Sequence, residues 1–225
     1  MTTIKCNPQN TFFTFSNWTL VGIIDSDGGF AYKLTLRKGN KVGFGLVTVI
    51  TQAAANDAFL HDIHNQLGLS AKLQRKATGK LQNGQDKVST VLNAAWTTKG
   101  GKKLLKIFKK CKPRCPGKYH DYLIGLVFLE ILENKYVLKR VEHESWSHDT
   151  KVTVSAVAAI FLYFQKANEL NPYSKTRKKE STPQEWLAHL QPSQFELAEG
   201  QKLYQTLMKE IDTKVEALRS AVKNI

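Results

Sequence analysis

The sequence predicts an α+β fold in which two β-hairpins alternate with helices, and further helices follow toward the C-terminus. Three observations favour it: apolar residues at helical spacing, two pairs of segments that alternate apolar and polar residues, and polar turns between them. The chain has 225 residues, 42% of them hydrophobic, which is enough for a sizeable core. We expect one domain over residues 1–190 and a helical extension over 191–225 that packs on it.

The first helix and hairpin are predicted before residue 51. Asn17–Asp25 has the pattern of a short, mostly buried helix, which begins at an N-cap residue type and ends before Gly28. Phe30–Arg37 alternates with the period of two that is typical of a half-buried strand. The turn Lys38–Lys41 leads to a second alternating run, Phe44–Ile50, so these segments indicate a hairpin.

The same pattern is predicted a second time. Asn56–Leu67 indicates a helix that Gly68 caps, and its apolar positions are Ala58, Phe59, Ile63 and Leu67. The strands of a second hairpin are predicted at Lys72–Thr78 and Lys87–Trp96. The helix that follows, Lys102–Lys110, is apolar on one side and rich in lysine on the other.

Helices dominate the rest of the chain. Tyr119–Glu133 and Val152–Asn168 are strong helices by their apolar spacing, and Ser174–Pro183 is a basic linker. Thr182 is expected to cap a helix that begins at proline, which is favoured at the first helical position. A final amphipathic helix over Glu196–Val222 is expected to pack on the body of the protein.

Charge and cysteine content restrict the class of partner. Lysine and arginine number 33 against 19 acidic residues, so a polyanion is expected, with nucleic acid favoured over an anionic membrane surface. No stretch approaches the roughly 18 apolar residues of a membrane-spanning helix, and the N-terminus lacks a secretory signal pattern. The three cysteines do not form a recognisable zinc or disulfide pattern, which favours reduced thiols inside a cell.

Basic and amide side chains gather on one predicted face of the two hairpins. An antiparallel sheet with such a face can enter a major groove, where Lys, Arg and Gln read base edges and turn lysines contact phosphates. The alternative is an ordinary solvated sheet face. The predicted face and turns hold Lys33, Thr35, Arg37, Lys38, Lys41, Lys72, Gln74, Lys76 and Lys80.

An acidic segment ends the first predicted helix in this basic chain. Hydrolysis of a phosphodiester needs an activated water and a stabilised leaving oxygen, and Mg²⁺ can supply both when carboxylate oxygens hold it. Asp25 and Asp27, in "DSDGG", are therefore candidate metal ligands beside the basic sheet. The alternative is a polar turn with a helix-terminating glycine.

The segment "LVGIIDSDG", Leu20–Gly28, resembles the LAGLIDADG motif of homing endonucleases. Val21 departs from the small residue usual at its position. The predicted order of helix, hairpin, helix, hairpin and helix is similar to that family's core. The basic "SKTRK" at Ser174–Lys178, followed by a capped C-terminal helix, resembles the single-motif, homodimeric branch that organellar introns encode.

The resemblance implies roles for particular residues in a magnesium-dependent double-strand DNA endonuclease. Asp27 and the carbonyl of Ser26 are implied as metal ligands, and Asp25 as a more structural acid. Gln52 resembles the glutamine that organises solvent in the family. A lysine before the helix at Tyr119 is implied to complete the site; Lys118 is favoured, and Lys112 remains an alternative.

The resemblance also implies a partner chain and a long DNA target. Two copies are expected to dock through Trp18, Val21, Gly22 and Asp25 on their first helices and to bind a pseudo-palindromic site. Lys175, Arg177 and Lys178 are expected to add DNA contacts. An organelle is the expected location, with the bacterial cytoplasm as an alternative, and no membrane is expected. Two other functions remain open: a splicing maturase on the same fold that binds intron RNA, and a non-catalytic DNA-binding regulator.

Overall fold

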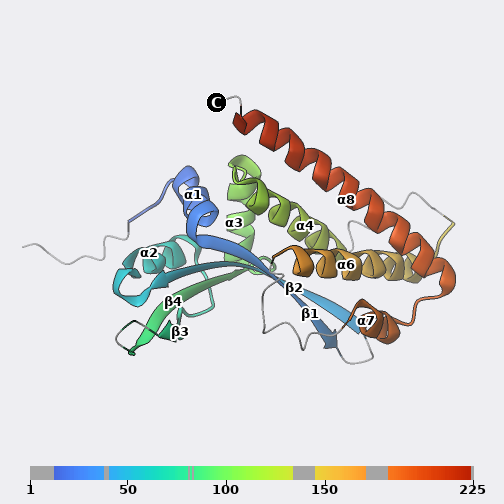
Figure 1. The fold of residues 1–225 in the computed structure, drawn as a ribbon, viewed down its shortest axis with the longest axis horizontal. Coiled ribbons are helices and arrows are strands. Elements are labelled where there is room, and N and C mark those ends of the chain that lie inside the picture. The colour runs from blue at the N-terminus through green and yellow to red at the C-terminus, as the bar shows by residue number, and fades with distance from the viewer. Residues whose placement is uncertain are drawn as a thin grey trace, which may run out of the picture. The chain divides into compact units, whose positions relative to one another are not determined.

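The structure is a computed structural model and describes residues 13–223, apart from 38–40, 81, 83, 134–144 and 171–181 (Figure 1). At residues 36, 37, 41, 56, 78 and 166–170 it describes the backbone alone. The expected linker at Ser174–Pro183 therefore lies almost wholly outside the described residues. Among the described helices, none is both long and apolar enough to cross a bilayer.

The order of elements confirms the predicted α+β fold with an αββαββα core. Strands pair in the order β1-β2-β4-β3, and β3 and β4 are antiparallel. The core elements are α1 (Asn17–Asp27), β1 (Gly28–Arg37), β2 (Lys41–Ala53), a 3₁₀ helix η1 (Ala54–Asn56), α2 (Ala58–Leu67), β3 (Gln74–Lys80), β4 (Asp86–Ala95) and α3 (Lys99–Lys110). The helices beyond them are α4 (Pro116–Leu132), α6 (His148–Leu170), α7 (Pro183–Leu190) and α8 (Gln194–Lys223).

The chain divides into two compact units. The first unit comprises residues 1–29 and 48–112, and the second comprises residues 30–47 and 113–225. Strand β2 is shared, since its residues up to Val47 belong to the second unit and those from Thr48 to the first.

The first unit is built on helices with well-defined ends. Helix α1 begins where the Ser16 hydroxyl accepts a hydrogen bond from the Thr19 N–H at 3.1 Å, as the N-cap prediction requires. Helix α2 ends at Gly68, whose φ of 64° is the left-handed conformation that favours glycine. The predicted apolar stripe of α2 was partly wrong, because Ala58 is exposed in the first turn while the missed Leu60 is fully buried.

Helix α3 lies very close to the end of β4. A Cβ atom added to Gly101 would lie 1.9 Å from the Ala95 carbonyl oxygen, so no larger residue fits there. Just before α3, the indole N–H of Trp96 donates to the hydroxyl of Thr48 at 2.7 Å, and both residues are almost completely buried. This bond ties the end of β4 to β2 in the core of the first unit.

The second unit combines an aromatic cluster with packed helices. Phe44 stacks on Phe128 with ring centroids 5.3 Å apart, and Tyr32 donates its hydroxyl proton to the Asp121 carbonyl. Helix α8 packs on α4 and α6, as was expected of the final helix, and Gly200 of α8 lies directly against Val157 of α6. The helix predicted over Tyr119–Glu133 is confirmed by α4, and most of its residues from Tyr119 to Ile131 are buried. A capping box between Thr182 and Glu185 begins α7, as predicted.

The second hairpin differs from its prediction in bounds and in burial. Strand β3 begins at Gln74, so Lys72 lies in the preceding segment and is exposed. The expected apolar face of this strand is absent from its described side chains, because Arg75 and Ala77 are exposed as well as Lys76. Strand β3 therefore differs from β1, the other edge strand of the sheet, which buries Phe30 and Leu34 on one face.

Candidate functional site

Two residues that the family resemblance assigned to the same site lie in contact in the first unit. Asp27 is the last residue of α1, and Gln52 lies near the end of β2. The Gln52 side-chain nitrogen Nε2 donates a hydrogen bond to Asp27 Oδ2 at 2.9 Å. Because one oxygen of the carboxylate is held in this way, the group has a defined orientation at the end of the helix.

Gly28 allows the chain to turn from the helix into the strand immediately after Asp27. Its N–H donates to the carbonyl of Ile24, which closes the last turn of α1. A Cβ atom at Gly28 would lie 2.7 Å from Ile24 Cα and 3.0 Å from its carbonyl oxygen, so a side chain at this position would displace backbone. Gly28 thus determines where the helix ends and where the Asp27 carboxylate lies.

The charge at this helix end is unfavourable for the isolated chain. Asp25 and Asp27 both lie in the last turn of α1, which contains no basic residue. The C-terminus of a helix carries partial negative charge, which favours cations over carboxylates. A bound cation would relieve the repulsion, so the electrostatics of the helix end fit a metal site better than a simple turn.

The chemistry of the available donors fits Mg²⁺ as part of a larger site. The Asp27 carboxylate is exposed and offers hard oxygen ligands, as does a backbone carbonyl such as that of Ser26. The described residues hold no cluster of three or more His, Cys, Asp or Glu side chains. The described part of one chain therefore supplies few protein ligands, which suits an ion that keeps several waters and binds substrate phosphate.

The lysine expected to complete the site stays a prediction. Lys118 lies on α4 in the second unit and is half-buried. The alternative, Lys112, is exposed and is the last residue of the first unit.

The exposed side of α1 differs from the predicted docking face at one position. Val21 is only 2% exposed and packs inside the folded chain with Leu20, so it cannot meet a second chain. Trp18 is 55% exposed, and a Cβ atom at Gly22 would have no neighbour within 4 Å. These two lie one helical turn apart, and Asp25 is half-buried near the end of the same helix.

The predicted DNA-contacting residues fall into three groups. Lys33, Lys72, Gln74, Lys76 and Lys80 are exposed, and Thr35 is half-buried. Lys80 also forms an ion pair with Asp86 at 2.8 Å across the β3–β4 hairpin. The side chains of Arg37 and Lys41, and the whole of Lys38, Lys175, Arg177 and Lys178, lie outside the described residues.

The register of the β3–β4 hairpin adds one residue that the sequence analysis missed. Lys76 lies opposite Ser89, and side chains of directly paired residues share a face. Lys87 is two residues from Ser89 and therefore projects to the same face as Lys76, where it is exposed. The alternation along β4 is visible in the sequence, but it identifies Lys87 only when the register of β4 against β3 is known.

Thr90 and Arg75, on the other face of that hairpin, both contact the carboxylate of Asp57. Thr90 donates its hydroxyl to Asp57 Oδ2 at 2.5 Å, and Arg75 Nη2 lies 3.6 Å from the same oxygen. The Thr90 hydrogen bond, with the nearby Arg75 and His61, holds the pKa of the Asp57 carboxyl below its usual value against the opposing effect of desolvation. Arg75 is directly opposite Thr90, so it belongs to the helix side of the sheet rather than to the face of Lys76.

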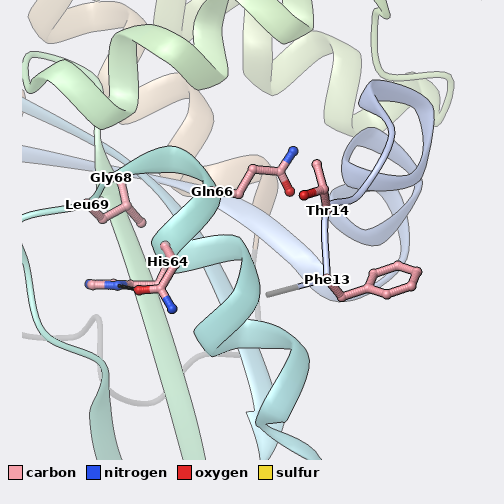
Figure 2. Close-up of a pocket in the computed structure, with 7 residues that line it drawn as sticks. Phe13, Thr14, His64, Gln66, Gly68 and Leu69 are labelled. Atoms are coloured by element: carbon pink, nitrogen blue, oxygen red, sulfur yellow. Dashed lines mark hydrogen bonds between the residues drawn. The ribbon is translucent and has the colours of Figure 1, made fainter. Parts of the chain in front are cut away.

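A shallow hollow of about 340 Å³ lies beside α2 and is lined by residues such as His64 and Gln66 (Figure 2). Gln66 exchanges two hydrogen bonds with the Phe15 backbone, at 2.8 and 2.9 Å. His64 Nε2 lies 2.9 Å from the Ala71 carbonyl oxygen. The side chains of Gln66 and His64 thus make hydrogen bonds within the first unit.

No protein-family model and no curated protein sequence matches the chain. Solved structures with a similar fold include the homing endonuclease I-TnaI, which is 14% identical with a TM-score of 0.47, over 79% of this chain and 99% of that one. The archaeal intron-encoded homing endonuclease I-Vdi141I, solved in complex with DNA, is 18% identical with a TM-score of 0.47, over 78% and 94%.

The LAGLIDADG homing endonuclease I-GzeII, solved in complex with its DNA target, is 17% identical with a TM-score of 0.47. The match covers 79% of this chain and 58% of I-GzeII, so the chain spans little more than half of that protein. Similarity at these identities concerns the fold alone. The αββαββα order is read from the chain's own elements and does not depend on these structures.

Proposed function

We propose that the chain is a homodimeric, Mg²⁺-dependent homing endonuclease that cuts both strands of a long pseudo-palindromic DNA site. The observation that carries the proposal is the Gln52–Asp27 hydrogen bond at the glycine-terminated end of α1. The chain has a net charge of +14, which favours binding to a polyanion. Its exposed, oriented Asp27 carboxylate can act on the phosphates of that polyanion once a cation lies between the carboxylate and the phosphate.

Asp27 and the Ser26 carbonyl would hold the metal ion. When bound, Mg²⁺ supplies an activated water and stabilises the leaving oxygen of the phosphodiester. Gln52 positions Asp27 through its amide nitrogen, which leaves the amide oxygen to accept a hydrogen bond from the attacking water. Lys118, or Lys112 in its place, would stabilise negative charge that develops at the phosphate.

Exposed side chains would bind the DNA, on β1 in the second unit and on the open sheet face of the β3–β4 hairpin in the first. Lys33 of β1, and Gln74, Lys76 and Lys87 of the second hairpin, are exposed donors that can reach base edges or phosphates. Bending of the target would add to its recognition at positions that no side chain touches.

A second copy of the chain would complete the enzyme by docking on α1. The exposed Trp18 and the open space at Gly22 leave room on this helix for a partner helix at short distance. Gly22→Gln should therefore halve the molar mass measured by light scattering without unfolding the chain. Gly117→Gln on α4 is the matched control, because Gly117 also has no neighbour within 4 Å. Equal masses for both variants would contradict docking through α1.

Cleavage of a randomised duplex library, followed by sequencing of the cut ends, tests the proposed activity and needs no target chosen in advance. The proposal expects paired cuts at one long site in Mg²⁺, and binding without cutting in Ca²⁺. Asp27→Asn should bind the enriched site and leave it intact. Binding of that site by the wild type with no cutting in Mg²⁺ would leave a DNA-binding regulator as the better explanation.

A further inference from the structure

Helix α3 carries a lysine face that the proposed function does not use. This face consists of Lys99, Lys102, Lys103, Lys106, Lys109 and Lys110, and all six side chains are exposed. With 3.6 residues per turn they fall within about a third of the helix circumference. The opposite side of α3 holds Gly101, Leu104 and Phe108, which are buried.

Solubility alone is a weak explanation for this face. Helix α3 contains no acidic residue, so no oppositely charged neighbour within the helix offsets the lysines. Lys99 and Lys103, and Lys106 and Lys110, are four residues apart, a spacing at which like charges destabilise a helix. A helix that retains such repulsion is suited to a polyanion that neutralises it.

The lysine face points away from the sheet face proposed to bind the target. Leu92 and Ala94 of β4 are completely buried, and they alternate in phase with Thr90, which contacts Asp57 beside α2. Helix α3 packs on both α2 and β4, so it covers this same side of the first unit. Lys76 and Lys87 project from the other side. A straight duplex on the open sheet face cannot reach both sets of residues.

We propose that the lysine face binds the phosphate backbone of a second DNA duplex, without regard to its sequence, while the sheet holds the first. Lysine is a flexible point charge that binds phosphate, and the face lacks the Arg, Asn and Gln side chains that read base edges in fixed geometry. The inference rests on the proposed function only in taking DNA as the partner. A second contact of this kind allows transfer between DNA segments during the search for a target.

A capture assay tests the second site directly. A biotinylated duplex of arbitrary sequence is immobilised, saturated with protein in EDTA and washed, and a fluorescent duplex is then added. The wild type should retain the fluorescent duplex, and retention should fall steeply with salt. The variant Lys99→Gln/Lys106→Gln/Lys110→Gln should bind the first duplex but lose capture of the second. In direct titrations with the second duplex, the slope of log affinity against log salt should be smaller by up to about 3.

The matched control removes the same charge from α8. Lys209→Gln/Lys214→Gln/Lys223→Gln changes three exposed lysines of that helix and should capture the second duplex as the wild type does. Glutamine is nearly as good a helix former as lysine, and circular dichroism of both triple variants verifies folding. Asp27→Asn should also capture normally, so failure of cleavage and failure of the second site are separable.

Three outcomes would overturn the proposal. The first is undiminished capture by the α3 variant, which would place both duplexes on sheet faces of a dimer. The second is loss of first-duplex binding by that variant, which would make the lysine face the primary DNA site. The third is stronger capture of a fluorescent RNA hairpin than of the DNA duplex by the wild type, which would assign the face to RNA.

Discussion

Two glycines of the α1 motif are expected to respond in opposite ways to replacement by alanine. At Gly22, in the middle of the helix, a new Cβ atom meets no atom within 4 Å. Alanine there should stabilise the monomer by about 0.5–1 kcal/mol, because glycine loses more backbone freedom on folding. At Gly28 the new Cβ atom would lie 2.7 Å from Ile24 Cα, against ordinary contacts of 3.4–4 Å.

The overlap at Gly28 cannot be relieved by rotating a side chain, since Ile24 Cα and its carbonyl oxygen belong to the helix backbone. Overpacking of this kind costs about 1–3 kcal/mol, so the two variants should differ by about 1.5–4 kcal/mol in free energy of unfolding. Urea titration followed by circular dichroism measures both, at concentrations where sedimentation shows a monomer. Unfolding free energies within about 0.5 kcal/mol of each other, with equal m-values, would refute the steric reasoning.

Further predictions concern polar and ionisable side chains. Because the Thr90 hydrogen bond lowers the pKa of Asp57, this carboxylate should add stability above its usual pKa of about 4 and lose it as the pH falls, so Asp57→Asn should flatten the acid side of a stability profile. Burial raises the pKa of Tyr122 to about 12, so stability should be intact below about pH 10 and fall between pH 10 and 12, and Tyr122→Phe should reduce that fall in alkaline unfolding curves. Thr48→Val should cost about 1–3 kcal/mol in urea titrations, since the Trp96 N–H then loses its acceptor, whereas Thr48→Ser keeps a hydroxyl and should cost less.

Local rules explain why much of the fold could be predicted. The alternation of β1 and β2 is strong because one face of each strand is buried, and Ser16, Gly68 and Thr182 occupy cap positions where their chemistry is distinctive. The start of β3 was missed for a physical reason. An edge strand with no fully covered face carries little hydrophobic pattern, so the sequence marks its bounds poorly.

The candidate site was predicted from resemblance more than from the residues themselves. Gln52 is 25 residues from Asp27, and no local pattern indicates that a glutamine at the end of β2 meets the end of α1. The Asp57–Thr90 contact was missed because it depends on the register of β4, which sequence patterns do not define. The resemblance placed Val21 on the docking face, whereas in this chain Val21 is only 2% exposed and packs in the chain's own core.

The central claim is that Asp27 holds the metal and that Gln52 acts through it. Single-turnover cleavage rates of the wild type, Asp27→Asn, Gln52→Ala and the double variant test this claim most directly, on the site recovered from the randomised library. The account predicts a loss of about 10–100-fold for Gln52→Ala, and no measurable cutting for Asp27→Asn or for the double variant. Cutting by Asp27→Asn within tenfold of the wild-type rate would contradict the account.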